Sequence, residues 1–362
     1  MLSEIGSNFW ITPDEIQGDI KTISPSIFNC AGSDYVWLST GRSAISYVIQ
    51  TIKDRFPNTR KIVCLPSFTC HTVYEPFLNA GYKIVTLPIG RNLKSNADDI
   101  YNVIKECYAG VVLFHKYFGF ETLPNINNII PKLRNMGVVI IEDCTQSMFS
   151  NIERIDADFY VGSIRKWCGV PDGAFAVCKD GIFHNKPDEY DRQLEQAKRY
   201  ASELKYKYII RGEGEKQPFL EAYRDAEKIL SNQSKLYKIG DLSKLIFSNI
   251  DIENLVKHRN ANGKRLLSIL INIDGVEPVF KTISEGVAPL YLPILCTNRS
   301  ALQKLLVENS IYAPIVWPKG DNCPSVCDDA DYLYEHLLCV PIDQRYHTED
   351  IDRIGRIITS HN

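Results

Sequence analysis

The sequence VVIIEDCTQSMFSNIERIDADFYVGSIRKWCGVPDGAFAV occupies residues 138–177. It opens with an apolar run that turns acidic at Glu142 and Asp143. A second apolar segment, 158–162, leads to Lys166, and a loop containing glycine and proline precedes a third at 174–177. Short, continuous apolar runs bounded by turn residues are typical of strands buried on both faces of a sheet.

An acid at the end of a buried strand and a lysine in a later loop are the side chains that pyridoxal 5′-phosphate (PLP) requires. A carboxylate beside the pyridine nitrogen keeps that nitrogen protonated, so the ring can accept electrons. A lysine amine bonds covalently to the cofactor. We therefore interpret Asp143 and Lys166 as catalytic residues of a PLP site.

The segments before residue 138 predict an α/β fold. Apolar strands at 61–66, 82–87 and 110–115 alternate with helical segments, which indicates a parallel sheet covered on both faces. Ligands of such sheets bind outside the carboxyl ends of the strands. Polar residues follow four predicted strands, at Ser67 to His71, His115 to Tyr117, Asp143 to Gln146, and Ser163 to Lys166.

A predicted strand–turn–helix unit at residues 35–52 could bind the cofactor phosphate. The small-residue turn Thr40-Gly41-Arg42-Ser43 comes directly before residues with helical spacing at 45–52. The first N–H groups of a helix are unpaired and favour anions, and Arg42 could add a charge-assisted contact. The alternative interpretation is an ordinary helix N-cap.

Two domains are expected from the 362 residues. We predict a large domain at 1–245, which includes an irregular N-terminal arm and a charged helical connection at 188–245 broken at 211–214. The second domain, 246–362, begins with a long helix from residue 252. Its predicted strands are 276–279, 288–295, 313–316 and 337–342.

Composition excludes several classes of function. The formal net charge of −3, with no basic cluster, argues against a nucleic-acid partner. The N-terminus lacks a signal-peptide pattern, and no apolar stretch approaches the roughly 20 residues of a membrane helix. The odd count of 11 cysteines, without a CxxC pair, predicts no metal site and free thiols in the cytoplasm.

The order of these motifs resembles the DegT–StrS family of PLP-dependent sugar aminotransferases over nearly the whole chain. Ile141 to Gln146 is the most specific match, to the Ile-Glu-Asp-Ala-Ala-Gln segment of that family. Similar segments are Ser39 to Ala44, Leu65 to Thr69, His115 to Gly119, and Val340 to Ile342. The resemblance implies PLP fold type I, with a large parallel or mixed seven-stranded sheet domain and a smaller C-terminal α/β domain.

The resemblance also implies roles for individual residues. Asp143 would pair with the pyridine nitrogen, and Lys166 would hold the cofactor. The other implied cofactor-binding residues are Gly41, Arg42, Ser43, Cys70, His71, Gln146 and Ser163. Candidate substrate contacts are His115, Tyr117, Trp317 and Lys319. The implied substrates are an amino donor such as glutamate and a nucleotide-linked ketosugar, in a homodimer with shared active sites.

Three other activities compete with this interpretation. Sugar dehydratases of the same family replace the lysine with histidine, so Lys166 argues against that reaction. The loop Lys166 to Gly173 resembles the Lys-Trp-x-x-x-Pro-x-Gly loop of class V PLP enzymes, which favours a lyase or desulfurase. A PLP-fold binding or regulatory protein with little turnover is the third alternative.

Overall fold

The computed structural model describes residues 4–233, 235–319, 324 and 326–361. The chain forms two compact units. Unit 1 contains the described residues of Met1–Ser7, Ile52–Asp158 and Ile252–Asn362, and unit 2 contains those of Asn8–Thr51 and Phe159–Asp251. The predicted domain boundary between residues 245 and 246 stays a prediction.

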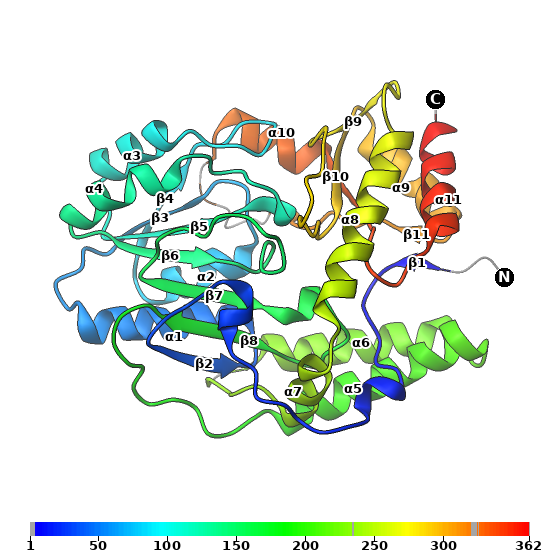
Figure 1. Ribbon diagram of the computed structural model, residues 1–362, viewed down its shortest axis with the longest axis horizontal. Helices are drawn as coiled ribbons and strands as arrows, with labels where there is room; N and C mark the ends of the chain where they lie inside the picture. Colours follow the sequence, from blue (N-terminus) through cyan, green and yellow to red (C-terminus); the bar gives the residue numbers. More distant parts are fainter. Residues whose placement is uncertain (1–3, 234, 320–323, 325, 362) are drawn as a thin grey trace. The chain divides into compact units, whose positions relative to one another are not determined.

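Four parallel strands in unit 1 carry several of the predicted site residues (Figure 1). They are β3 (Ile62–Pro66), β4 (Lys83–Leu87), β5 (Val111–His115) and β6 (Val139–Asp143). β3 pairs with β4 and β5, and β5 pairs with β6. All residues of β5 and β6 are buried, which explains why these strands are continuous apolar runs.

Helices alternate with these strands, as the sequence pattern predicts. They are α2 (His71–Asn79), α3 (Ala97–Glu106) and α4 (Ile130–Asn135). Asn96 caps α3 by accepting the N–H groups of Asp98 and Asp99 at 2.8 and 3.3 Å. α3 and α4 lie side by side in Figure 1. Between them, Lys132 Nζ of α4 lies 5.4 Å from the ring centroid of Tyr101 of α3.

Three further strands belong to unit 2. They are β2 (Asp34–Leu38), β7 (Phe159–Ser163) and β8 (Ala174–Cys178), and β8 pairs antiparallel with both β2 and β7. The complete sheet has seven strands in the order β2-β8-β7-β6-β5-β3-β4. This confirms the predicted fold class, a mixed seven-stranded sheet in an α/β protein.

The C-terminal part of unit 1 is a smaller α/β assembly. Its antiparallel sheet consists of β9 (Val276–Pro278), β10 (Leu292–Cys296) and β12 (Leu337–Val340). Its helices are α8 (Ile252–Ile269), α9 (Arg299–Glu308), α10 (Asp328–His336) and α11 (Thr348–Thr359). α8 and α11 pack closely against each other (Figure 1). Gly355 of α11 permits this approach, since a Cβ at that position would lie only 2.7 Å from Cγ2 of Ile269 on α8.

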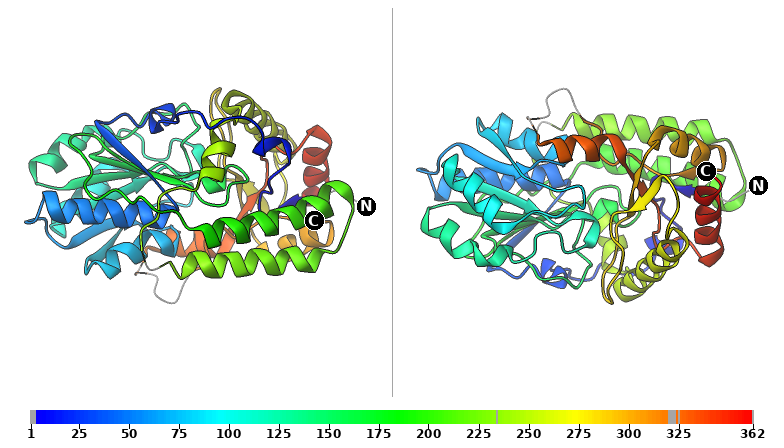
Figure 2. Two further views of the ribbon diagram at one scale, coloured as in Figure 1. Left: turned by 90° about the horizontal axis from the view of Figure 1, so that it is seen from below. Right: turned by 90° about the horizontal axis from the view of Figure 1, so that it is seen from above.

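Unit 2 contains a long helical hairpin. α5 (Arg192–Tyr206) continues into a π-helix, η6 (Lys207–Arg211), and α6 (Lys216–Ser231) returns beside α5 (Figure 2). Ala201, Phe219 and Tyr223 form a small core between the two helices. The turn begins at Gly212, whose φ of 66° is left-handed, so the predicted break at 211–214 is confirmed. Unit 2 also contains α7 (Asp241–Ser248) and the part of α1 (Gly41–Arg55) up to Thr51.

Some elements differ from the sequence expectations. The strand expected at 313–316 is wrong: β11 (Ile311–Tyr312) ends before Pro314 and pairs instead with the unpredicted β1 (Ile5–Gly6). The helical segment that precedes β6 is divided into two helices, a 3-10 helix over Ile126–Asn128 and then α4. Proline lacks an N–H and favours the first turn of a helix, which is where Pro131 lies in α4.

No helix in the described part of the chain is both long enough and apolar enough to cross a membrane.

Candidate active site

Asp143 is the last residue of β6 and lies opposite His115, the last residue of β5. Because the two strands are parallel, their carboxyl ends bring both side chains to the same edge of the sheet. Asp143 is 8% exposed, and its Oδ1 accepts the N–H of Thr145 at 2.9 Å. This hydrogen bond stabilises the carboxylate and fixes its orientation.

Gln146 is tied to the same edge of the sheet. Its Oε1 accepts the N–H of Phe118 at 2.9 Å, in the turn that follows β5. Phe118 has a left-handed backbone with φ of 53°, which a residue other than glycine adopts only when its surroundings hold it there. The structure therefore brings Asp143, Gln146, His115 and Tyr117 together in unit 1.

An aromatic cluster surrounds His115 and Tyr117. Trp317 stacks on His115 with centroids 5.8 Å apart and an interplanar angle of 24°. Tyr117 meets His115 edge-on at 4.4 Å and donates its hydroxyl hydrogen to the carbonyl of Phe68 at 2.7 Å. Trp317 is only 4% exposed, so its ring helps to position His115. Burial also raises the pKa of Tyr117, which keeps its hydroxyl protonated.

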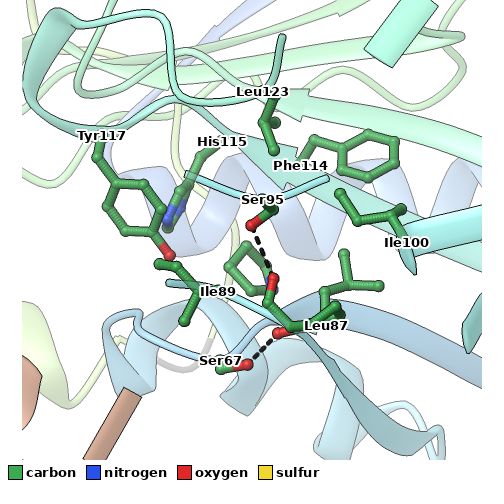
Figure 3. Close-up of a pocket in the computed structure, with 11 residues that line it drawn as sticks. Ser67, Leu87, Ile89, Ser95, Ile100, Phe114, His115, Tyr117 and Leu123 are labelled. Atoms are coloured by element: carbon green, nitrogen blue, oxygen red, sulfur yellow. Dashed lines mark hydrogen bonds between the residues drawn. The ribbon is translucent and has the colours of Figure 1, made fainter. Parts of the chain in front are cut away.

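A small hollow lies behind His115 and Tyr117 (Figure 3). Its volume is about 10 Å³, which suits one water molecule at most. Ser95 closes one side by donating to the carbonyl of Pro88 at 2.7 Å, and Ser67 donates to the carbonyl of Leu87. This hollow is too small for a substrate, so it belongs to the packing behind the two rings.

The other candidates in unit 1 have different surroundings. Cys70 is the N-cap residue of α2, and its Sγ lies 3.9 Å from Nδ1 of the exposed His71. Lys319, predicted as a substrate contact, forms an ion pair with Asp331 of α10. A substrate anion would therefore compete with Asp331 for this lysine. Within the described residues, no cluster of three or more His, Cys, Asp or Glu side chains could hold a metal ion.

The 40–43 turn in unit 2 forms the N-terminus of α1. Thr40 Oγ1 accepts the N–H of Ser43 at 3.0 Å and lies 2.8 Å from Ser43 Oγ, so Thr40 is the capping residue. A Cβ on Gly41 would lie 3.4 Å from Cβ of Ser163 at the end of β7. Glycine thus leaves open a small space between the first turn of α1 and Ser163.

The lysine turn follows Ser163 directly. Lys166 ends a 3-10 turn, Ile164–Lys166, and Ile164 donates its N–H to the carbonyl of Gly173 at 3.1 Å. Gly173 in turn donates its N–H to the carbonyl of Ser39 at 2.7 Å. Its φ is 129°, and a Cβ there would lie 2.7 Å from the Ile164 side chain, so only glycine fits. Unit 2 therefore brings together the lysine turn and the start of the 40–43 turn.

The buried carboxylate of Asp172 holds this loop in place through hydrogen bonds, a role that the sequence did not predict. Its carboxylate accepts the Ser243 hydroxyl and the N–H of Gly240, the latter at 3.1 and 3.2 Å to its two oxygens. The side chain is 2% exposed, and burial raises its pKa from 3.8 to about 7, against hydrogen bonds that lower it. Its partners lie in or beside α7, far along the chain, and no local pattern reveals them.

We expect Asp172 to make the stability of the protein depend on pH. Its pKa is raised in the folded state, so its contribution is complete below about pH 4 and is lost as the pH rises to about 7. Relative to Asp172→Asn, the wild type should lose about 2 kcal/mol of unfolding free energy between about pH 5 and 7.5. Denaturant unfolding at the two pH values measures this loss. The exposed Asp180→Asn variant is the control, and equal pH dependence in wild type and Asp172→Asn would contradict the assignment.

An ion pair network with one buried member, Lys198, holds the residue before Lys166. Arg165 donates to Oε1 of Glu227 on α6 at 2.9 Å, and the same oxygen pairs with Lys198 on α5. Lys198 is 6% exposed, and burial lowers its pKa to about 8. These contacts direct Arg165 toward the helical hairpin. The hairpin therefore anchors the lysine turn, a role that the prediction of a charged helical connection at 188–245 did not include.

Comparison with solved structures identifies the fold. No protein-family model matches the sequence, and no curated protein matches it. A DegT DnrJ EryC1 StrS aminotransferase from Brucella abortus matches 92% of this chain and 87% of its own, with 17% identity and a TM-score of 0.63. The sugar aminotransferase CalS13 from Micromonospora echinospora matches 99% of each chain, with 15% identity and a TM-score of 0.67. The chain has the fold of the DegT–StrS sugar aminotransferases.

The DegT–StrS fold also includes a dehydratase among its solved structures. GDP-4-keto-6-deoxy-D-mannose-3-dehydratase from E. coli, with bound hydrated PLP, is 15% identical to this chain, with a TM-score of 0.62. The match covers 92% of this chain and 89% of the dehydratase. The predicted resemblance to DegT–StrS structures and the predicted fold type I are therefore confirmed, and the fold accommodates more than one reaction.

Proposed function

We propose that this protein is a PLP-dependent aminotransferase that transfers an amino group from an amino acid such as glutamate to a nucleotide-linked ketosugar. The observation that carries the proposal is the position of Lys166. It lies in a tight turn directly after β7, fixed by Gly173, in a chain that has the DegT–StrS fold over its full length. A fixed lysine at a strand end suits covalent binding of a cofactor.

The residues present fit PLP. The open space at Gly41 and the N-terminus of α1 suit a phosphate, with Arg42 and Ser43 as further donors. The buried carboxylate of Asp143 suits a protonated pyridine nitrogen, and the amide donor of Gln146 suits the phenolic oxygen of the ring. We assign Ser163 to the phosphate, and Cys70 or His71 to the face of the ring.

The reaction would divide its tasks among these residues. Bound PLP supplies an electron sink for the charge that develops when the Cα–H bond of the amino donor breaks. Lys166 would hold the cofactor covalently, and its amine would move the proton that leaves Cα. Asp143 would keep the pyridine nitrogen protonated, and we assign His115 and Tyr117 to substrate contact. Amination of the ketosugar uses the same groups in reverse order.

The proposal also covers the oligomeric state, the cellular location and the partners of the enzyme. We propose that the active protein is a cytoplasmic homodimer with shared sites, because the resemblance to DegT–StrS enzymes implies residues from a second subunit. The partners are small molecules, the amino donor and the ketosugar. Trp317 would position His115, on which it stacks, for contact with the ketosugar. Lys319 would contact the ketosugar only after its ion pair with Asp331 breaks.

A two-stage spectral assay tests the proposed reaction. PLP-saturated protein is mixed with each of several amino acids, and the absorbance of the bound cofactor is followed as it converts to the amine form. We expect glutamate to convert it with release of 2-oxoglutarate, and a nucleotide-linked ketosugar to restore the starting spectrum. Release of sulfide from cysteine would favour a class V-type desulfurase instead. A bound cofactor that no amino acid changes would contradict the aminotransferase and favour a binding protein.

A further inference from the structure

A hollow of about 290 Å³ opens on unit 2, and none of its lining residues is among those assigned above. Segment 11–16 of the N-terminal arm forms one wall, and one face of α5 and η6 forms the other. Three cationic side chains line it, those of Arg199, Lys207 and Arg211, together with the single carboxylate of Glu203. We refer to it as the arm pocket.

The sequence spacing explains why these charges share a face. Arg199, Glu203, Lys207 and Arg211 follow one another at every fourth position. Taken alone, this pattern is typical of a solvated helix face with local ion pairs, and Glu203 does pair with Lys207 at 2.9 Å. The charged residues that line the pocket are therefore three cations and one carboxylate, and two further carboxylates, Asp14 and Glu15, lie on the arm segment opposite, where Glu15 accepts the N–H of Thr12 at 2.7 Å.

The wall opposite these charges is firmly attached. Ile11 donates its N–H to Ser202 Oγ, and the carbonyl of Phe9 accepts the hydroxyl of Tyr223 at 2.8 Å. The carbonyl of Asn8 accepts a hydrogen bond from the ammonium group of Lys205, and this group also lies over the ring of Trp10. The arm is thus bonded to both α5 and α6, which holds this wall of the pocket in place.

The end of the pocket combines a π-helix with an aromatic ring. Lys207 and Arg211 are the first and last residues of η6. Such widened turns occur frequently at functional sites. The guanidinium group of Arg211 lies 5.6 Å from the ring centroid of Tyr206, which also lines the pocket. Tyr206 and the isoleucines of the arm give the pocket an apolar surface beside its cations.

We propose that the arm pocket binds a small organic phosphate whose remaining part is planar or apolar, such as a nucleoside monophosphate. Guanidinium groups match phosphate oxygens in charge and geometry. The three lining cations, Arg199, Lys207 and Arg211, offer charged donors for the phosphate oxygens, and the pocket has about the volume of a small-ligand site. The tyrosine ring and the isoleucine side chains would contact the base. This site is independent of the proposed aminotransferase reaction.

Calorimetric titration of the full-length, PLP-treated protein with uridine monophosphate tests the site. The test variant is Arg199→Gln/Arg211→Gln. The matched control is Arg224→Gln/Lys228→Gln, which removes two exposed cations from α6 in the same unit. We expect the affinity for uridine monophosphate to fall at least about tenfold in the test variant and to change less than about twofold in the control. Uridine, which lacks the phosphate, should bind at least about tenfold more weakly than the monophosphate.

Three results would overturn the proposal. No heat of binding up to millimolar uridine monophosphate would exclude an organic phosphate site of useful affinity. Equal affinity in the wild type and the Arg199/Arg211 variant would place the nucleotide elsewhere, including at the residues assigned to the aminotransferase. If the test and control variants lose affinity for uridine monophosphate equally, the loss would reflect the net charge of the protein and not a specific site. Circular dichroism of both variants confirms that each is folded before titration.

Discussion

The Lys166→Ala variant should lose both covalent cofactor binding and turnover. Alanine removes the amine that bonds to PLP and the same amine that moves the proton between Cα and C4′. Because two functions disappear together, we expect the aminotransferase rate to fall by at least about a thousandfold. Absorbance of the PLP-treated protein after desalting, together with 2-oxoglutarate release from glutamate, measures both losses.

The control for this variant is another lysine of unit 2. Lys228 lies on α6 with its side chain 74% exposed, so Lys228→Ala should retain the cofactor spectrum and the rate. Backbone hydrogen bonds of Ile164 and Gly173 hold the turn that contains Lys166, so the alanine variant should keep the fold. Cofactor that remains covalently bound to Lys166→Ala would exclude Lys166 as the attachment site.

The Asp143→Asn variant should separate cofactor binding from catalysis. Asparagine keeps an oxygen for the N–H of Thr145 but carries no negative charge, so it cannot hold the pyridine nitrogen protonated. We expect the rate of amino transfer to fall roughly a thousandfold, while Lys166 still holds the cofactor. Single-turnover conversion of the bound cofactor by glutamate measures the loss.

Exposed Asp352 provides the matched control in unit 1. It forms an ion pair with Arg265 at the protein surface, so Asp352→Asn should leave the rate unchanged. A rate for Asp143→Asn within about twofold of the wild type would remove Asp143 from the catalytic residues. A variant that loses the cofactor entirely would instead assign Asp143 to cofactor retention.

The sequence pattern predicts most of the sheet and the strand ends. Continuous apolar runs predict β3, β5, β6, β7 and β8, because strands buried on both faces need apolar residues at every position. The position of Asp143 and Gln146 at the end of β6 predicts that both side chains lie at one strand end. In the structure Asp143 lies opposite His115 of β5, and Gln146 accepts the N–H of Phe118 in the turn after β5. The lysine turn at Lys166 likewise follows β7 directly.

The missed features depend on contacts between distant residues. Asp172 is fixed by Ser243 and Gly240, and nothing near Asp172 in the sequence encodes either partner. Glu227 holds Arg165 in the same manner from α6. The spacing of charges on α5 predicts only a solvated helix face, since the arm that makes it a pocket comes from the N-terminus. Tertiary contacts of this kind decide how the site is held, and local patterns do not report them.

The prediction of a strand at 313–316 was wrong because composition alone does not report hydrogen bonding. Apolar composition alone favours a strand there, but Pro314 has no N–H to donate to a neighbouring strand. The carbonyl of Pro314 instead accepts the N–H of Cys339 in β12 at 3.2 Å. This segment leads to Trp317, whose stacking on His115 was not predictable from spacing, because the two residues come from separate parts of unit 1.

Chemical fixation of the cofactor tests the central claim most directly. Borohydride reduction of the PLP-treated protein makes the link between cofactor and lysine permanent, and peptide mass spectrometry then locates it. The rival site is Lys198, a buried lysine whose pKa is lowered to about 8 and which is therefore also nucleophilic near neutral pH. We predict one phosphopyridoxyl group per chain, on Lys166. A label on Lys198 or another lysine, or no label, would contradict the account.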